Sequence, residues 1–167
     1  TASGNGGGIY AHSADMVMDG VAFSGNHAGG GGGMYNYGNN LHTFTNVIFS
    51  GNTASDSGGG LIQSFGYPVM TNVVFSGNTA TNKGGGFYTM GEPVLINATF
   101  SGNSANFGGA IYNEDRVTLT NSVLWGNLAP NGAQIYNNAN PPIVTYSLVQ
   151  GGWEGTGNLE ADPLFVD

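Results

Sequence analysis

The sequence has no cysteine and only two basic residues, Lys83 and Arg116. Without cysteine, a disulfide framework and a thiolate zinc site are both excluded. Two cations cannot neutralise many phosphates, which excludes a nucleic-acid-binding protein and a protein held electrostatically on an anionic membrane. No apolar run in this sequence approaches the ~20 residues of a membrane-spanning helix, so no transmembrane segment is predicted in it.

Charge in general is scarce, whereas glycine is abundant. Charged residues make up 7% of the chain, the net charge is −8, and 31 of the 167 residues are Gly. An ordinary domain has about 25% charged residues. The glycines occur in clusters rather than at every third position, which excludes collagen. Because 40% of the residues are hydrophobic, the chain has enough apolar side chains for a core, and we expect a folded protein.

Two motifs repeat in phase along the chain. The tetrapeptide Phe-Ser-Gly-Asn occurs four times, and a weaker copy, 124–127, follows them. The Asn residues that close these five copies are separated by 26, 26, 25 and 24 residues. A Gly cluster followed by an apolar residue, and in most copies by Tyr, keeps the same spacing over six copies, from 6–10 to 132–136. Two motifs in phase predict a repeat protein.

The segments before each Phe, such as 69–75 and 117–124, are rich in β-branched and aromatic residues, and we expect one strand in each. A second short strand is expected at each Gly-rich motif. So short a repeat cannot bury its own apolar face, so successive copies must stack with equivalent strands parallel. We therefore predict an all-β fold, a right-handed parallel β-helix (β-solenoid) of about six coils with 24–27 residues each, over residues 1–152. Residues 153–167 leave the repeat and are expected to form a cap or a joint.

Alignment of the repeats separates inward from outward positions. The position five residues before each Phe is always apolar and is expected inside, whereas the next position is mostly Thr and is expected outside. The position after that is mostly Asn, which tolerates the left-handed conformation that a sharp corner needs. Two columns of Asn are therefore predicted to form structural ladders along the solenoid. They are Asn46, Asn72, Asn97 and Asn121 at the corner, and Asn26, Asn52, Asn78, Asn103 and Asn127 at the end of the tetrapeptide.

The motifs are similar to those of a known family. Gly108-Gly109-Ala110-Ile111 and the four Phe-Ser-Gly-Asn copies resemble the paired GGAI and FxxN repeats of the chlamydial polymorphic outer membrane proteins, whose passenger regions are β-helical autotransporter adhesins. Asp162-Pro163-Leu164-Phe165 also resembles a segment that follows the last coils of large secreted bacterial β-helix proteins. The resemblance implies an exported solenoid at a bacterial surface, and it carries over no catalytic residue.

A polysaccharide-degrading β-helix enzyme, a lyase or a hydrolase, is the alternative function. A lyase needs a basic residue beside Ca²⁺ held by carboxylates, but the two basic residues of the chain are expected in different columns. A hydrolase needs two carboxylates about 5–9.5 Å apart. Asp15 with Asp19 and Glu114 with Asp115 are conceivable pairs, but no acidic column forms along the repeats. We therefore predict no catalytic residue and no enzymatic activity.

No metal or cofactor is predicted either. His12, His27 and His42 are spaced by 15 residues, which is out of step with the coil and places them on different faces. Calcium binding is conceivable in so acidic and Asn-rich a chain, but the nonapeptide calcium pattern is absent, so no motif supports it.

Two columns are candidates for binding at the surface. The first consists of Tyr10, Tyr35, Tyr88, Tyr112 and Tyr136. If these side chains point outward, they form an aromatic stripe that can stack on sugar rings or on a protein; if they point inward or along a corner, they are packing residues. The second is a partial Thr ladder like those of ice-binding solenoids, formed by Thr45, Thr71, Thr120 and Thr145. Asp19 and Ile96 break this ladder and it lacks a complete second Thr row, so ice binding is not predicted.

The chain begins in mid-coil, because Thr1-Ala2-Ser3 is equivalent to Thr53-Ala54-Ser55. An open solenoid end exposes unpaired strand edges and core. We therefore expect either a fragment of a longer protein or a subunit that associates end to end with another copy and propagates as a filament. The function predicted from the sequence is an extracellular structural or adhesive β-solenoid of a bacterial cell surface, with a surface glycan, a protein or another copy of itself as partner.

Overall fold

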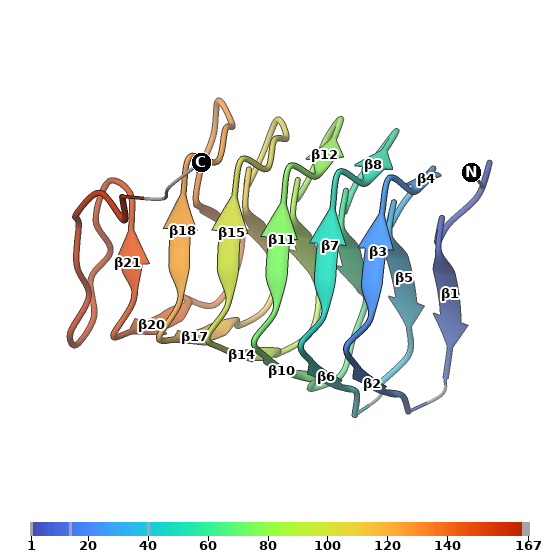
Figure 1. Ribbon diagram of the computed structural model, residues 1–167, viewed down its shortest axis with the longest axis horizontal. Coiled ribbons are helices and arrows are strands. Elements are labelled where there is room, and N and C mark those ends of the chain that lie inside the picture. Colours follow the sequence, from blue (N-terminus) through green and yellow to red (C-terminus); the bar gives the residue numbers. More distant parts are fainter. Residues whose placement is uncertain (1, 14, 40, 165–167) are drawn as a thin grey trace.

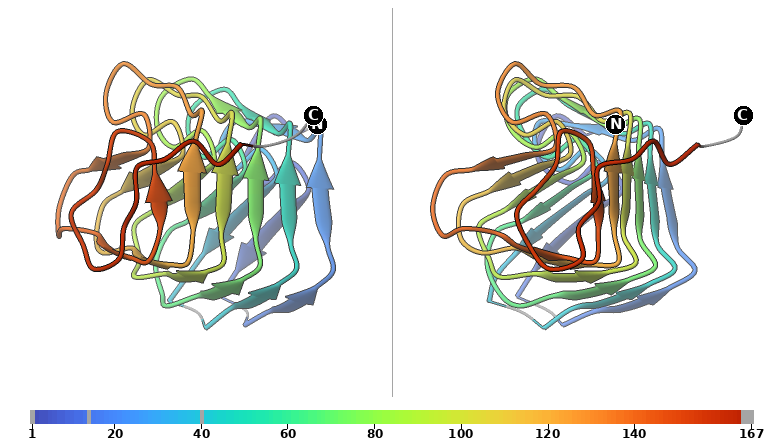
Figure 2. Two further views of the ribbon diagram at one scale, coloured as in Figure 1. Left: turned by 60° about the vertical axis from the view of Figure 1, so that its left-hand side comes forward. Right: turned by 90° about the vertical axis from the view of Figure 1, so that its left-hand side faces the viewer.

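The protein is an all-β parallel solenoid of about six coils, as predicted (Figure 1). The computed structural model describes residues 2–13, 15–39 and 41–164. Thr1 and Phe165, which belong to the sequence patterns described above, lie outside these residues. Every strand pairs in parallel with its equivalent in the next coil, and successive coils overlay when the solenoid is viewed along its axis (Figure 2). The described residues form no helix long and apolar enough to cross a membrane.

Within the described residues, three sheets of six strands form the sides of the solenoid. Face 1 consists of β1 (Ile9–His12), β5 (Met34–Tyr37), β9 (Leu61–Gln63), β13 (Phe87–Thr89), β16 (Ile111–Asn113) and β19 (Ile135–Asn137). Face 2 consists of β2 (Val17–Asp19), β6 (Thr43–Thr45), β10 (Val69–Thr71), β14 (Val94–Ile96), β17 (Thr118–Thr120) and β20 (Ile143–Thr145). Face 3 consists of β3 (Ala22–Ser24), β7 (Ile48–Ser50), β11 (Val74–Ser76), β15 (Thr99–Ser101), β18 (Val123–Trp125) and β21 (Leu148–Val149).

A fourth, smaller sheet lies where the chain leaves face 3. It consists of β4 (His27–Ala28), β8 (Thr53–Ala54) and β12 (Thr79–Ala80). The loops that follow it project from the body of the solenoid before the chain enters face 1 (Figure 2).

A sharp corner separates face 2 from face 3. At this corner Asn46, Asn72 and Asn97 have φ of +55° and Asn121 has φ of +52°. The predictions of one strand over 69–75 and one over 117–124 are therefore wrong, because the chain turns at Asn72 and at Asn121. The first segment divides into β10 and β11, and the second into β17 and β18. The strand-forming composition continues across the turn, and a single residue that tolerates the left-handed region is enough to make the turn.

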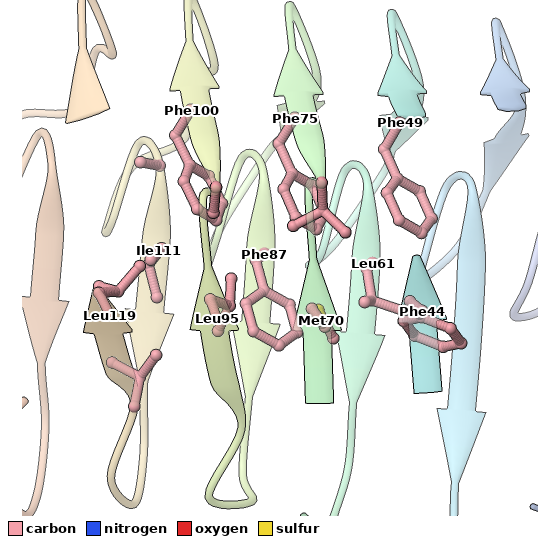
Figure 3. Packing of buried hydrophobic residues seen from close by; sticks show 14 of the residues in the cluster. Phe44, Phe49, Leu61, Met70, Phe75, Phe87, Leu95, Phe100, Ile111 and Leu119 are labelled. Carbon is pink, nitrogen blue, oxygen red and sulfur yellow. The ribbon is translucent and has the colours of Figure 1, made fainter. Parts of the chain in front are cut away.

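The core is built from columns of identical or similar side chains. One column is a face-to-face stack of rings with centroids 4.7–4.8 Å apart, formed by Phe23, Phe49, Phe75 and Phe100. Figure 3 shows the last three of these rings, and Leu124 continues the column in the next coil. The apolar column predicted inside face 2 is buried in every coil; it consists of Met18, Phe44, Met70, Leu95, Leu119 and Val144. Because each ring meets its equivalent one strand spacing away, the repeat itself supplies the packing partner.

The Gly clusters fit a place where backbones approach closely. Gly58 has φ of +64°, which favours glycine, and a Cβ on Gly59 would lie 2.4 Å from the carbonyl oxygen of Gly85 in the next coil. The second position therefore has no room for a side chain, and the first has the wrong backbone conformation for one.

The C-terminal segment folds back on the last coil. Trp153 packs against the buried core, and Leu159 pairs with Leu148 of β21 as a parallel bridge. A backbone hydrogen bond joins this segment to β21, because Val149 N donates to Leu159 O at 3.0 Å.

Candidate functional site

The inner Asn ladder, formed by the residues that close the tetrapeptide, is fully engaged in structure. Asn52 Nδ2 donates to Asn78 Oδ1 at 2.9 Å and to the Phe23 carbonyl at 2.9 Å, and Asn52 N donates to Asn78 Oδ1 at 3.0 Å. The same pattern recurs at Asn78 and Asn103, and these side chains are buried. Their amides are therefore occupied by one another and by the backbone.

The outer Asn ladder lies at the corner between face 2 and face 3. Asn72 Nδ2 donates to Asn46 Oδ1 at 3.1 Å, and Asn97 Nδ2 donates to Asn72 Oδ1 at 3.1 Å. In the first coil, where Gly20 takes the corner position, Asn46 Nδ2 donates to Asp19 Oδ1 instead at 2.9 Å. These amides are exposed, so water can replace the bonds between them.

A third ladder, which the sequence analysis missed, lines the inner side of face 1. It consists of Asn36, Gln63, Thr89, Asn113 and Asn137, in the column that follows the Tyr column. Asn36 Nδ2 donates to Gln63 Oε1 at 2.8 Å, and Asn113 Nδ2 donates to Asn137 Oδ1 at 2.7 Å. Among the described residues, Asn36 Oδ1 and Asn113 Oδ1 have no hydrogen-bond partner. The preceding coil has Ala11 or Thr89 at this position, and neither supplies an amide donor.

The Tyr column points outward from face 1, but projecting loops cover most of it. Tyr10 is 52% exposed and Tyr112 only 5%. Phe107 packs edge-on against Tyr136, with ring centroids 5.2 Å apart, and Lys83 Nζ lies 4.7 Å from the centre of the Tyr112 ring. The column is therefore not an open stripe, since the loops use it as a packing surface.

Lys83 contacts both the Tyr column and the carboxylate of Glu114. Its Nζ lies 2.9 Å from Glu114 Oε1, so the ammonium is held between a carboxylate and aromatic rings. Burial raises the pKa of Tyr88 to about 12, with a further contribution from the nearby Glu114 carboxylate. Lys83 precedes a strand of face 1, whereas Arg116 follows one, so the two basic residues lie at different ends of that sheet.

The carboxylates paired from the sequence have other partners. Asp15 Oδ1 accepts a hydrogen bond from Leu41 N at 2.9 Å, and Asp19 and Glu114 are bonded to Asn46 and Lys83.

The histidines are also engaged separately. His12 stacks on Tyr37 with ring centroids 5.2 Å apart, His27 Nδ1 lies 2.7 Å from Thr53 Oγ1, and His42 is buried beside Phe44. Within the described part of the chain, no three His, Cys, Asp or Glu side chains form a cluster that could hold a metal ion.

One corner differs from coil to coil. We call the segments 38–39, 64–68, 90–93 and 114–117, which connect face 1 to face 2, the variable corner. Its segments include Ser64-Phe65-Gly66-Tyr67-Pro68 in one coil and Met90-Gly91-Glu92-Pro93 in the next. These two share Gly-x-Pro, but no residue pattern runs through all four segments. In repeat proteins, such variation collects in the loops of one side, which is often the binding side.

A depression of about 120 Å³ opens at the variable corner. It is lined by Asn39, Phe65, Gly66, Tyr67, Met90, Gly91, Glu92 and Asp115. Phe65 is 47% exposed and Tyr67 is 54% exposed, and the Phe65 ring meets Tyr37 edge-on with centroids 6.2 Å apart. Asn140 Nδ2 donates to Asp115 Oδ1 at 2.8 Å, which fixes that carboxylate.

This depression combines exposed aromatic rings with hydrogen-bond acceptors. Aromatic faces stack on apolar faces of a ligand, while carboxylate and amide oxygens accept hydrogen bonds from its hydroxyl groups. Sequence reasoning did not pair Glu92 with Asp115, because they occupy different places in their coils. The available signal was the loss of the repeat pattern between the two sheets.

Comparison with known families matches three successive segments of the chain, 46–63, 72–90 and 97–114, to the Chlamydia polymorphic membrane protein repeat. Each segment begins at an outer-ladder Asn and contains one Phe-Ser-Gly-Asn and one Gly cluster. The resemblance predicted from these motifs is thus confirmed, over a third of the chain. Comparison with curated proteins and with solved structures gives no match.

Proposed function

We propose that the protein is an extracellular, non-enzymatic β-solenoid that acts as an adhesive element at a bacterial cell surface. Two findings support this proposal: the repeat match over three coils and the parallel solenoid fold. The adhesins that the motifs resemble are built on the same kind of repeat and are displayed at the cell surface.

The variable corner is the proposed contact with the ligand, and a surface glycan is the proposed ligand class. The observation that carries this assignment is the pair of half-exposed rings, Phe65 and Tyr67, beside Glu92 and Asp115. A pyranose has apolar faces for the rings and hydroxyl groups for the carboxylates. A strongly anionic glycan is disfavoured, because the chain carries a net charge of −8.

Binding to a glycan array by the full chain tests the proposal. For a glycan that binds, the double variant Phe65→Ala/Tyr67→Ala is expected to weaken binding roughly tenfold, since each stacked ring contributes about 0.5–1.5 kcal/mol. The matched control is Tyr10→Ala, which removes an exposed ring from the Tyr column. Equal losses in the two variants, or no glycan bound by the wild type, would contradict the assignment.

A glycan-degrading enzyme is the second candidate function. The observation in its favour is that Glu92 and Asp115, from neighbouring coils, line the same depression. Incubation of array-positive glycans with the wild type and with Glu92→Gln and Asp115→Asn separates the two functions. We expect no cleavage by any of them; cleavage by the wild type that is lost in the variants would replace adhesion by hydrolysis. End-to-end assembly, one of the two alternatives left open by the sequence, stays a prediction.

A further inference from the structure

The outward side of face 2 carries two columns of side chains that are almost entirely β-branched. The first column is Val17, Thr43, Val69, Val94, Thr118 and Ile143. The second is Asp19, Thr45, Thr71, Ile96, Thr120 and Thr145. All positions except Asp19 hold Val, Ile or Thr, and every one of them is partly or fully exposed.

These two columns form a regular array. Equivalent residues follow one another at the strand spacing of about 4.8 Å, and residues i and i+2 of a strand are about 6.6–6.8 Å apart. A β-branched side chain has few χ1 rotamers, so its methyl and hydroxyl groups are held in fixed positions. Thr120 and Thr145 show this order directly, since their Oγ1 atoms lie 3.2 Å apart.

Both columns lack the groups that bind most ligands. Neither contains an aromatic or basic residue, and the single carboxylate, Asp19, lies in the first coil with its Oδ1 bonded to Asn46 Nδ2. The outer Asn ladder borders the array at the corner, with amides fixed at the same spacing. The surface is thus uncharged over five of its strands and consists of methyl groups, hydroxyl groups and ordered amides.

The size of the array argues against a protein partner. It is about 29 Å long, with its columns about 7 Å apart, which amounts to a few hundred Å², whereas a stable interface needs roughly 800 Å² from each partner. Stacking of sugar rings needs aromatic side chains, which are missing here. A surface of many identical, weak and evenly spaced contacts fits an occupant that is itself periodic and uncharged.

We propose that face 2 binds ice. Water beside fixed methyl groups is restricted in orientation, and fixed hydroxyl and amide groups hydrogen-bond to water at defined positions. A rigid array of both kinds can hold a layer of ordered water that continues into the lattice of a growing ice surface. The sequence argued against this because the Thr ladder is interrupted; the structure adds a complete adjacent column of β-branched residues and shows that Ile96 keeps the shape of the array.

Thermal hysteresis and partition into slowly growing ice test the proposal on the full chain. The wild type is expected to show both activities. Thr71→Lys, which places a charge at the centre of the array, is expected to abolish them. The matched control is Ser76→Lys, in the same coil but on face 3, and it is expected to leave both unchanged.

Ile96→Thr restores a hydroxyl to the second column and is expected to increase hysteresis, so the proposal is testable even if Thr71→Lys does not fold. No activity in the wild type, or equal activity in the two Lys variants, overturns the proposal. Adsorption to crystalline cellulose that is lost in Thr71→Lys, without any effect on ice, would assign the face to a polysaccharide and also overturn it.

Discussion

In the columns of the solenoid, each coil repeats the side chain of the coil before it, whereas in the variable corner neighbouring coils carry different residues. The Phe column stabilises the fold because each ring packs against the equivalent ring of the neighbouring coil. The corner holds Tyr67, Glu92 and Asp115 around one depression. Tyr67 and Glu92 stand at the same position of successive coils, two residues before β10 and β14, yet one is aromatic and the other is acidic. The uniform columns therefore stabilise the fold. Because the variable corner is not part of these columns, its side chains can differ in chemistry from coil to coil.

The largest effect is expected from breaking a column at its centre. Phe75 stacks between Phe49 and Phe100 and also meets Phe87 at 5.8 Å. Phe75→Ala leaves a cavity and is expected to lower the free energy of unfolding by about 3–5 kcal/mol, measured by urea denaturation. Phe75→Leu is the control, because Leu124 already occupies this column, and its loss should be much smaller. Equal losses would mean that the stacked ring, rather than the apolar volume that Leu restores, stabilises the column.

The two Asn ladders are expected to differ in their contributions. Asn78 makes buried bonds to Asn52, Asn103 and the Phe49 carbonyl, so Asn78→Ala leaves several buried groups unpaired and should cost about 3 kcal/mol. Asn72→Gly removes a member of the exposed ladder but keeps the left-handed conformation, so its effect should stay within about 0.5 kcal/mol. Both are measured by thermal and urea unfolding. A large loss in Asn72→Gly would show that the outer ladder, too, is structural.

The free energy of unfolding is expected to depend on pH through His42, which lies between the variable corner and β6. His42 is 1% exposed, its Nδ1 accepts a hydrogen bond from Met16 N at 3.1 Å, and burial lowers its pKa, although Asp15 opposes this. The unfolded chain therefore takes up the proton first. Stability from the neutral ring is complete above the ordinary pKa of about 6.5 and declines as the pH falls towards the folded value.

Unfolding midpoints measured between pH 8 and pH 5 check this effect, with His42→Gln as the variant that lacks the titrating ring. The wild type should lose stability over this range more steeply than His42→Gln. His27→Gln is the control for the replacement of a histidine at an exposed position. A steeper slope in His42→Gln than in the wild type would contradict the assignment.

Most of the fold was predictable because equivalent strands pair in register. Residues one repeat apart in the sequence therefore lie next to each other in neighbouring coils. The Phe column, the apolar column inside face 2 and the Asn columns follow from counting residues, and the corner could be expected because Asn tolerates the left-handed conformation. The division of 69–75 was not predicted, since both halves have strand composition. The depression at the variable corner was not predicted, because no residue pattern runs through its four segments and because segments of different coils must meet to form it. The third ladder escaped for another reason: its residues, Asn, Gln and Thr, differ in type but share one role.

Completing this third ladder is expected to have the smallest effect. The side chains of Gln63, Asn113 and Asn137 each donate to the carbonyl two residues ahead, as Thr89 does to Gly91. Thr89→Asn can keep that bond and offer its second amide hydrogen to Asn113 Oδ1, which has no partner among the described residues. We expect a gain of about 1 kcal/mol in urea unfolding. Thr89→Val is the control; it removes the hydroxyl that accepts from Gly91 N and should destabilise the protein. If Thr89→Asn destabilised the protein as much as Thr89→Val, the shape of the corner would require Thr at this position, and the expected bond to Asn113 would not form.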